Sequence, residues 1–347
     1  MGRRVLAFAI ALAVAWACSS SSKSDDPNTP LPASGAPTSA PPFDAAALPP
    51  PPPDASAWHA VVERDPDPSV VVSALSDVHG GWDRLAALLV GGGLAAAIPT
   101  SPDAIAWAGG SGILVVCGDL VDKGPQGLEV IDGLRALQAS AAAAGGEVIV
   151  LLGNHEAEFF VDPNNTKATA SDGFDVELGA RHIDPASVAS GADPHGAWLR
   201  DQPIAARVRG WFYSHAGNPK GRTIAALDLS LRAAIADHPS YLDPELVAAD
   251  SILEARDWYG DPNVVAADLA ALGVSHIVFG HDPNALGAKG SLGTNRAPSL
   301  LRIDCGMSPD VNDSTGCILR IRRDGGDEVA DEVRSNGSAR QVWRGPP

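Results

Sequence analysis

Residues Ile149 to Glu156 read IVLLGNHE, a run of four aliphatic residues that passes directly into Gly, Asn, His and Glu. Such a short apolar run is typical of a strand that is buried on both faces. In an open α/β sheet, ligands bind in the crevice beyond the carboxyl ends of the strands, where the loops carry polar groups. The stretch therefore predicts an α/β fold with a functional edge at its strand ends, where Asn154 and His155 lie.

On either side of this stretch, β-branched runs alternate with Ala- and Leu-rich segments of helical periodicity. Including the strand at Glu147–Leu152, we expect strands at Ser69–Leu75, Ile113–Cys117, Gly210–Ser214, Ser275–Gly280, Ser299–Asp304 and Cys317–Arg322. We expect helices at Trp82–Leu89, Gly127–Ala144, Thr223–Asp237, Asp243–Ala255 and Val264–Leu272. Early strand–helix alternation followed by successive strands predicts an α/β sheet packed on a second, mixed sheet.

One long segment shows no such periodicity. The stretch from Val161 to Gly196 is rich in Asp, Asn, Gly and Ser. We interpret it as an inserted loop over the crevice, in a position suited to substrate selection.

The composition excludes some classes of partner. The chain has 347 residues, of which 45% are hydrophobic and 5% aromatic, and its formal net charge is −17. Nucleic acid is not expected as the main partner, because proteins grip a phosphate backbone with Lys and Arg. A phosphorylated substrate remains compatible with the acidic surface, provided that a local cationic site outweighs the distant charge.

The N-terminal region resembles an export signal. Residues 1–17 combine two arginines with an apolar run that is too short to span a bilayer. Ala15-Trp16-Ala17-Cys18 resembles a bacterial lipobox, which predicts lipidation at Cys18. Plain secretion is the alternative, with Cys18 an ordinary residue. Residues 18–57 are rich in Pro, Ser and Ala and are expected to be a disordered tether before a folded domain at 58–347. The expected location is the bacterial cell envelope, with a lipid anchor in the membrane, or the exterior.

Three further cysteines are present. Cys117 ends the apolar strand ILVVC and is expected to be a buried small hydrophobe. Cys305 and Cys317 flank an 11-residue loop and either pair in an oxidising compartment or stay free, because spacing alone does not show that their Cα atoms lie close enough.

Polar motifs follow five of the expected strands. They are DVHGG at 77–81, GDLVDKG at 118–124, GNHE at 153–156, SHAGN at 214–218 and GHD at 280–282. Taken singly, Asp77 fits a helix cap, His79 a satisfied polar residue and Asn154 a turn. Together, so many buried carboxylates and imidazoles would repel one another and lose hydration unless cations lay among them.

The donor types favour particular metals. Carboxylate oxygens, imidazole nitrogens and an amide oxygen without thiolate suit Mn²⁺, Fe or Zn²⁺ in a binuclear site. A carboxylate such as Asp119 can bridge two ions, and two ions about 3.5–4 Å apart are the usual arrangement for in-line attack at phosphorus.

In this order the five motifs resemble the calcineurin-like metallophosphoesterase superfamily, and most closely its phosphoprotein-phosphatase branch. The stretches GAWLRDQPIAARVRGWFYSHAG and LRIDCGMS are similar to segments of bacterial Shewanella-like serine/threonine or tyrosine phosphatases. The resemblance covers Ser69 to Arg322. It implies an α/β/β/α fold, in which a β-sandwich of two mixed sheets is flanked by helices, and makes 58–347 a catalytic domain.

The resemblance also implies roles for individual residues. Asp77 and His79 would bind the first of two divalent ions, Mn²⁺ above all, and Asp119 would bridge both. The second ion would be completed by Asn154, His215 and His281. A metal-bridging hydroxide would attack phosphorus directly. His155, oriented by Asp122, would protonate the leaving oxygen, which is general acid catalysis.

Lys123, Arg200 and Asn154 are the expected substrate contacts. Lys123 replaces the family's usual Arg and offers a point charge in place of a bidentate fork. For Arg200 the alternative is a surface salt bridge. Asp304 and Met307 are expected only to shape a loop beside the site, and Glu156 either supports the metal ligands or caps the following helix.

The expected function is hydrolysis of phosphate monoesters, which include small molecules and phosphoproteins. Many diesterases of the superfamily carry a second His two residues after the first, where this chain has Pro283. A phosphodiesterase or nucleotidase on the same scaffold is the enzymatic alternative, and a surface-tethered metal-binding protein without catalysis is the other. Ser/Thr against Tyr preference, the native metal pair, the physiological substrate and the oligomeric state stay open.

Overall fold

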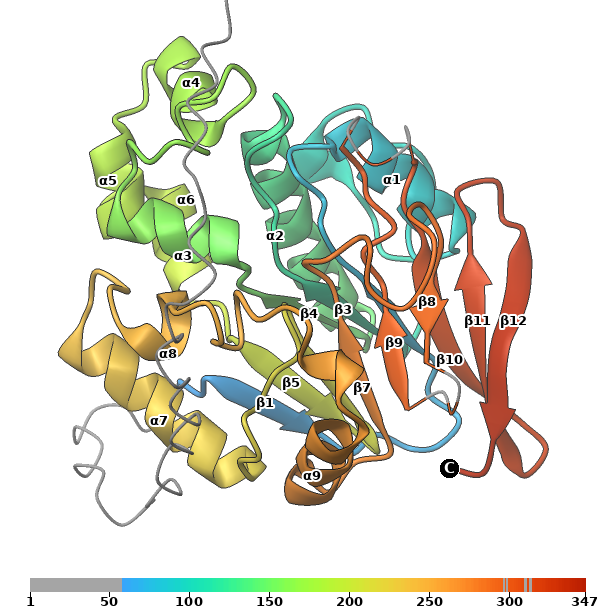
Figure 1. Ribbon diagram of the computed structural model, residues 1–347. Coiled ribbons are helices and arrows are strands. Elements are labelled where there is room, and N and C mark those ends of the chain that lie inside the picture. Colours follow the sequence, from blue (N-terminus) through green and yellow to red (C-terminus); the bar gives the residue numbers. More distant parts are fainter. Residues whose placement is uncertain (1–57, 296, 298, 309–310, 312–313) are drawn as a thin grey trace, which may run out of the picture. The chain divides into compact units, whose positions relative to one another are not determined.

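Two six-stranded mixed sheets form the centre of the fold in this computed structural model, which describes residues 58–295, 297, 299–308, 311 and 314–347 (Figure 1). The first sheet has the order β1 (Val61–Arg64), β5 (Ala205–Val208), β6 (Trp211–Ser214), β7 (His276–Phe279), β9 (Leu300–Arg302) and β8 (Gly293–Thr294). The second has the order β12 (Ala339–Gly345), β11 (Asp327–Val333), β10 (Ile318–Asp324), β2 (Val72–Leu75), β3 (Ile113–Cys117) and β4 (Glu147–Leu151).

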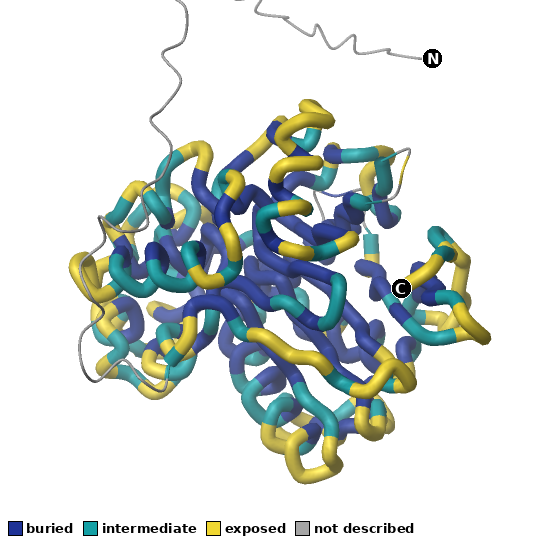
Figure 2. The backbone as a smooth tube through the Cα atoms, turned by 90° about the horizontal axis from the view of Figure 1, so that it is seen from below, coloured by how far each residue is buried: buried dark blue, intermediate teal, exposed yellow. Residues whose placement is uncertain are grey.

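Strand β3 shows how the sequence builds this sandwich. Its five residues are all buried, and successive side chains point to opposite faces. Ile113, Val115 and Cys117 belong to the core between the two sheets. Leu114 and Val116 belong to the second core, under the helices. A strand with an apolar layer on each side must be hydrophobic throughout, and in Figure 2 the central strands are accordingly buried while exposure is concentrated in the loops.

Helices cover the outer faces of the sandwich. Helix α2 (Gly127–Ala143) packs on β4 and beside α1 (Trp82–Gly91), while α7 (Ile224–Asp237) packs on β1. The remaining α-helices are α3 (Asn154–Val161), α4 (Phe174–Ala180), α5 (Pro185–Ser190), α6 (Pro194–Arg200), α8 (Pro244–Val247) and α9 (Pro262–Leu272), with short 3₁₀ turns at Pro102–Ala104 and Trp258–Gly260. The α/β/β/α sandwich expected from the sequence is confirmed.

Two expected elements are wrong. The helix expected at Asp243–Ala255 ends after one turn, at Val247. Ser251 explains the break, because its Oγ donates to the carbonyl of Leu246 and accepts from the amide of Glu254, and such local side-chain bonds compete with helix formation. The segment Val161–Gly196 is not a loop throughout, since it contains α4, α5 and the start of α6. Asp184 and Asp193 are side-chain caps of α5 and α6.

Five strands were not expected from the sequence: β1, β5, β8, β11 and β12. Strand β11 reads DEVADEV, a composition that does not favour strands. It forms because it pairs on both sides, with β10 and β12, and because Arg334 and Arg340 neutralise the buried carboxylate of Glu332.

Cys305 and Cys317 form a disulfide with a Cα–Cα distance of 5.7 Å, and Cys117 is a buried free thiol. Within the described part of the chain, no helix has both the length and the hydropathy needed to cross a bilayer. The expected signal at 1–17, the lipidation site Cys18 and the tether at 18–57 lie outside the described residues.

Candidate active site

The five polar motifs meet at one edge of the sandwich. Strands β2, β3 and β4 are parallel neighbours in one sheet, and β6 and β7 are parallel neighbours in the other. Backbone bonds join the motifs, since the amide of His79 donates to the carbonyl of Asp119 at 2.9 Å and the amide of Gly280 donates to the carbonyl of His215 at 2.7 Å. The edge predicted from the strand ends is therefore present.

The backbone at this edge takes an unusual conformation. Non-glycine residues rarely adopt positive φ, which costs roughly 1–2 kcal/mol per residue, although Asp, Asn and His tolerate it best. Such conformations cluster where the surrounding structure enforces them, often at functional sites. Six residues of the motifs have φ between +47° and +64°: Asp77, His79, Asp119, Asp122, Lys123 and His281.

Two glycines let carboxylates approach the backbone. A Cβ on Gly153 would lie 2.2 Å from Oδ1 of Asp119, and a Cβ on Gly280 would lie 2.3 Å from Oδ2 of Asp77. Any other residue at either position would push the carboxylate away. These glycines are thus part of the site although they carry no functional group.

One group of converging atoms comes from the turns after β3, β6 and β7 and from the first residue of α3. Nε2 of His215 lies 3.0 Å from Oδ1 of Asn154, 3.2 Å from Nδ1 of His281 and 3.3 Å from Oδ1 of Asp119. Nδ1 of His281 lies 3.1 Å from the same Asn154 oxygen. All four side chains are buried.

The second ring nitrogen of each histidine fixes which tautomer is present. Nδ1 of His215 lies 2.8 Å from the carbonyl of Cys117, and Nε2 of His281 lies 3.1 Å from the carbonyl of Glu254. Carbonyls accept only, so these nitrogens carry the protons and the two facing nitrogens carry lone pairs. Burial lowers the pKa of His281 to about 2. Lone pairs and carboxylate oxygens gathered in this way fit a cation among them.

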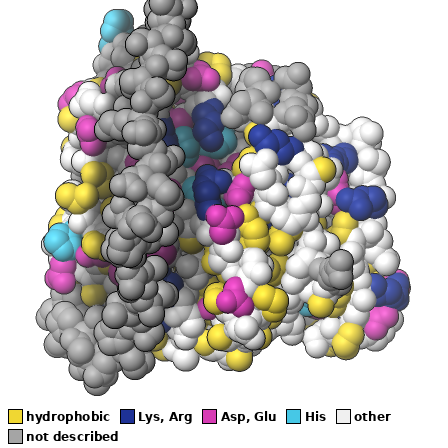
Figure 3. All heavy atoms as spheres, viewed as in Figure 1, with side chains coloured by type: hydrophobic (Ala, Val, Ile, Leu, Met, Phe, Trp, Pro, Cys, Tyr) yellow, Lys and Arg dark blue, Asp and Glu magenta, His cyan; other side chains and the backbone are white. Residues whose placement is uncertain are grey.

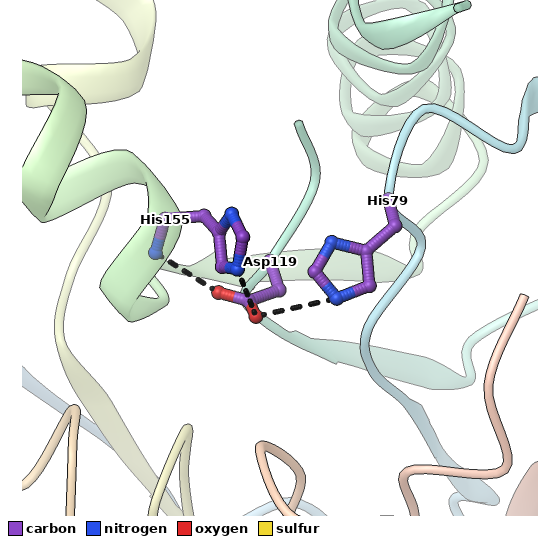
Figure 4. Close-up of side chains that lie close together, drawn as sticks. All are labelled: His79, Asp119 and His155. Carbon is purple, nitrogen blue, oxygen red and sulfur yellow. Dashed lines mark hydrogen bonds and ion pairs between the residues drawn. The ribbon is translucent and has the colours of Figure 1, made fainter. Parts of the chain in front are cut away.

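A second group consists of His79, Asp119 and His155 (Figure 4). Nδ1 of His79 lies 3.1 Å from the carbonyl of Val121, so Nε2 carries the lone pair and lies 3.5 Å from Oδ2 of Asp119. Burial lowers the pKa of His79 well below its ordinary value. Asp119 belongs to both groups, which fits the bridging role expected for it.

The charge on Asp119 is stabilised by its neighbours. Burial alone would raise the pKa of this carboxyl, but charged neighbours, protonated His155 and Lys123 among them, hold it well below the ordinary range. Asp119 is therefore a carboxylate at neutral pH, as a bridging ligand must be.

His155 differs from the other three histidines. Its Nδ1 lies 2.7 Å from Oδ2 of Asp122, a carboxylate, and its Nε2 lies 3.8 Å from Oδ2 of Asp119. Burial opposes protonation, but the charge of Asp119 and the bond to Asp122 outweigh it, and the pKa of His155 lies above its ordinary value. This ring is suited to holding a proton.

Asp77 lies at the base of the site. Its carboxylate accepts from the backbone amide of His281 at 3.1 Å and from the hydroxyl of Ser76. Asp304 lies nearby, and burial together with the charge of Asp77 raises its pKa well above the ordinary range. Its Oδ1 has no hydrogen-bond partner among the described residues.

Glu156 lies between helix α3 and the loop that carries Asp119. One carboxylate oxygen accepts from the amides of Asp119 and Gly153 at 3.0 and 2.8 Å, and the other accepts from the amide of Leu120 at 2.7 Å. The same side chain caps helix α3 and holds the Asp119 loop. Because these bonds are to buried amides and are charge-assisted, they strongly restrain the site.

The expected substrate contacts are found in different places. Lys123 lies at the site, with Nζ 3.0 Å from Nε2 of His79. The described contacts of Arg200 are instead with the rings of Phe160 and Tyr241, at 4.8 and 5.0 Å, and with the carbonyls of Ala189 and Pro239. None of these belongs to the two groups, and Arg200 as a phosphate contact stays a prediction.

Three charged residues that act on His281 or Asn154 were not expected from the sequence. Arg256 donates to the His281 carbonyl at 3.3 Å, and the charges of Arg256 and Lys167 lower the pKa of His281. Glu254, whose pKa burial raises to about 7, is hydrogen-bonded to Asn154. Glu254 lies within the segment wrongly expected to be a long helix and Arg256 directly follows it, so no strand-end signal pointed to them.

The segment 161–196 contacts the site. The amide of Phe174 donates to Oδ1 of Asp122 at 2.8 Å, and the amide of Gly124 donates to the carbonyl of Asp172 at 3.1 Å. Glu177 on α4 accepts from the amides of Gly127 and Leu128 at the start of α2. The position beside the crevice that was expected for this segment is thus correct, although its helical structure was not foreseen.

Known proteins share parts of this sequence. One relative is an uncharacterised protein of Schizosaccharomyces pombe, 36% identical over 25% of this chain and 25% of its own length. Another is Shewanella-like protein phosphatase 2 of Arabidopsis thaliana, 34% identical over 24% of this chain and 20% of its own. A third is the symmetrical bis(5'-nucleosyl)-tetraphosphatase of Methylococcus capsulatus, 30% identical over 45% of this chain and 49% of its own. This chain therefore spans less than half the length of these relatives.

Solved structures share the fold. A cold-active protein-tyrosine phosphatase of a psychrophilic Shewanella species has a TM-score of 0.63 at 22% identity, over 82% of each chain. A protein serine/threonine phosphatase of Saccharomyces cerevisiae has a TM-score of 0.54 at 17% identity, over 78% of each chain. At these identities the two structures show that the chain shares their fold.

A family model covers most of the folded region. The calcineurin-like phosphoesterase model matches residues 71–285, which include all five motifs and all the residues in the two groups of converging atoms. The fifth motif, at 280–282, lies just inside the same boundary. The chain belongs to the calcineurin-like phosphoesterase family.

Proposed function

We propose that this protein is a metal-dependent phosphatase that hydrolyses phosphate monoesters, phosphoproteins among them. The observation that carries the proposal is the contrast among the buried imidazoles. His79, His215 and His281 present lone pairs toward Asp119, while His155 is bonded to the carboxylate of Asp122 and suited to hold a proton. A ligand set beside a proton donor is what hydrolysis of a phosphate ester requires.

The residues divide the work as follows. Asp119, His79 and Asp77 would hold one divalent ion, and Asp119, Asn154, His215 and His281 the other. Two such ions, when bound, make water acidic enough to attack at phosphorus and offset the negative charge of the phosphoryl group. His155 donates its Nε2 proton to the leaving oxygen, and Asp122 keeps that ring oriented and positively charged until transfer.

Cations beside the site support a phosphate ester as substrate. Lys123 lies next to His79, Arg256 bonds to the carbonyl of His281, and Lys167 is near enough for its charge to act on His281. Figure 3 shows Lys, Arg and His side chains gathered in a hollow on the face that it presents. In a chain with a net charge of −17, this local concentration of positive charge attracts an anion that the rest of the surface repels.

A second candidate has support from one relative. The Methylococcus protein is by name a bis(5'-nucleosyl)-tetraphosphatase and matches 45% of this chain, so a phosphoanhydride or phosphodiester substrate is the alternative. Pro283, which stands where many diesterases carry a second histidine, favours the monoester.

The test compares an aryl phosphate monoester, a bis-aryl diester and a bis-nucleosyl tetraphosphate, with protein loaded in turn with Mn²⁺, Zn²⁺ and Fe²⁺. We expect turnover of the monoester to exceed that of the others, with Mn²⁺ the most effective ion. No hydrolysis of any substrate with any ion would contradict the proposal. Elemental analysis showing fewer than two ions per chain would instead favour a metal-binding protein without catalysis.

We also propose that the enzyme is anchored in the bacterial cell envelope through a lipid on Cys18. The proposal rests on the sequence ahead of the described residues. In cells grown with a labelled fatty acid, the chain should carry the label and sediment with membranes, and Cys18→Ala should abolish both. Release of the unlabelled wild-type chain into the medium would favour plain secretion.

A further inference from the structure

A cavity of about 200 Å³ opens beside the candidate active site. His79 and Lys123 form the side nearest the site. Besides Pro125, the cavity is lined by four side chains from the first turn of α1, from the residue before α2 and from the disulfide-closed loop after β9: Asp83, Arg84, Gln126 and Met307. None of these four belongs to the ligand groups or to the expected substrate contacts.

Two helices begin at the cavity. Gly81 precedes α1 and Gln126 precedes α2, and both residues line the cavity. The side chain of Gln126 accepts from the amide of Asp83 at 3.3 Å, which joins the two helix starts. Helix N-termini carry partial positive charge, so they add to the effect of cationic side chains.

Arg84 supplies a fixed positive charge at the wall. Its Nη1 donates to the carbonyls of Met307 and Ser314 at 2.7 and 2.9 Å, which holds the half-buried guanidinium in place. Among the described residues, Arg84 forms no ion pair with a carboxylate. Among the described residues that line it, the cavity has two cations, Arg84 and Lys123, against the single carboxylate of Asp83. Its charge is therefore opposite to that of the chain as a whole.

The position of the cavity relates it to the leaving group. The ring of His79 packs edge-on against that of His155, with centroids 4.8 Å apart. The cavity therefore begins one ring away from the proposed proton donor to the leaving oxygen. At about 200 Å³ it is smaller than the roughly 300–1,000 Å³ of whole-ligand pockets, and it suits a single side chain or a phosphate group.

We propose that this cavity is a leaving-group subsite, in which Arg84 binds a second anionic group carried by the leaving group of the substrate. The preferred substrates are then phosphomonoesters with a carboxylate or a second phosphate a few bonds from the scissile ester. Arg84 is the specificity-determining residue, and a guanidinium fixed by two carbonyls can receive an oxyanion without a large loss of side-chain entropy. This inference rests on the proposed phosphatase activity.

The experiment measures a ratio of kcat/KM values. One pair of substrates is a phosphoserine peptide with Glu or with Gln directly after the phosphoserine. The other pair is 1,3-propanediol bisphosphate and propyl phosphate. For each pair, wild-type protein loaded with Mn²⁺ should prefer the anionic member by about tenfold, the effect expected of one charge-assisted hydrogen bond.

Variants then separate charge from folding. Arg84→Gln should bring the ratio close to one, while Arg84→Lys should retain most of it because the charge stays. Arg135→Gln is the matched control, since Arg135 is an arginine on α2 whose described ion pair is with Asp132 and which lies outside the cavity lining. It should leave both ratios at the wild-type value.

The measured ratios identify the anionic group that is bound or overturn the subsite. A raised ratio for the peptide pair alone identifies a carboxylate as the group bound, and a raised ratio for the bisphosphate pair alone identifies a phosphate. Wild-type ratios near one in both pairs would overturn the subsite while propyl phosphate turnover left the phosphatase proposal standing. Equal losses of the ratio in Arg84→Gln and Arg84→Lys would also overturn it, because the effect would then come from the bonds to Met307 and Ser314. Absence of turnover on all four substrates would overturn both proposals.

Discussion

Four buried histidines lie within one site, and their second ring nitrogens divide them into two kinds. His79, His215 and His281 are each bonded through that nitrogen to a backbone carbonyl. His155 is bonded to the carboxylate of Asp122. A carbonyl fixes the proton on one nitrogen and leaves the imidazole neutral, whereas a carboxylate favours the imidazolium.

This difference distinguishes the three proposed ligands from the proposed proton donor, which proximity alone does not. Distance alone places His155 with His79 and Asp119 as a possible metal ligand. The pKa of His155 is raised and the pKa of His79 is lowered, although the two rings are in contact. Neighbouring imidazoles can thus be given opposite tasks by a single hydrogen-bond partner.

Removing a carbonyl-bonded imidazole should have the largest effect. His281→Ala deletes one of four converging donor atoms, so we expect loss of one bound ion and a fall in kcat/KM well beyond the roughly 10²-fold typical of general acid catalysis. Metal content by elemental analysis and turnover of an aryl phosphate check this. His238→Ala, at an exposed histidine, is the control. Full metal content in His281→Ala would remove His281 from the ligand set.

Removing the carboxylate-bonded imidazole should cost less and leave the metal in place. His155→Ala should lower kcat for an aryl phosphate by about 10²-fold or more, with two ions still bound. A leaving group of low pKa needs no proton, so the loss should shrink for such substrates. Loss of metal together with activity would show that His155 is a ligand.

Changing the partner of His155 should shift the pH profile. The pKa of His155 lies above its ordinary value of 6.5, so the protonated form, and with it activity, is lost as pH rises through that higher pKa. Asp122→Asn removes a charge that favours the imidazolium, and kcat should fall about tenfold while the alkaline limb moves to lower pH. A profile of kcat against pH is the measurement. An unmoved alkaline limb would mean that another group titrates there.

The smallest effect is expected at Lys123, which lies beside His79. Lys123→Arg offers phosphate two parallel hydrogen bonds in place of a point charge, so KM for an aryl phosphate should fall a few-fold with little change in kcat. The comparison uses steady-state kinetics at one ionic strength. An increase in KM would show that the shorter side chain of lysine contributes more to phosphate binding than the two parallel hydrogen bonds of arginine would.

The sequence predicted most accurately the elements for which amino-acid composition and position in the sheet favour the same structure. Strand β3 matches its expected bounds, because five apolar residues followed by a glycine leave little choice. The strand-end motifs could be assigned to one edge since parallel strands place their carboxyl ends together. Every residue expected in the ligand set lies at that edge, although its binding of metal stays a prediction.

The sequence predicted least accurately the features that depend on contacts with residues distant in the chain. Strand β11 forms from DEVADEV because Arg334 and Arg340 are brought to Glu332 by the fold. Arg256 and Glu254 reach the site from an irregular segment, and irregular segments have no periodicity to read. The tautomers that distinguish the histidines depend on carbonyls far away in the chain, such as that of Cys117 for His215.

The amide of Phe174 donates to Oδ1 of Asp122, the carboxylate oxygen that does not bond to His155. Phe174 is the first residue of helix α4, in the segment beside the crevice. A change of sequence there that alters which molecules are accepted would also alter how firmly the proton donor is oriented. If this segment selects substrates and His155 is the proton donor, as proposed, a change in this segment would be expected to alter preference and turnover number together.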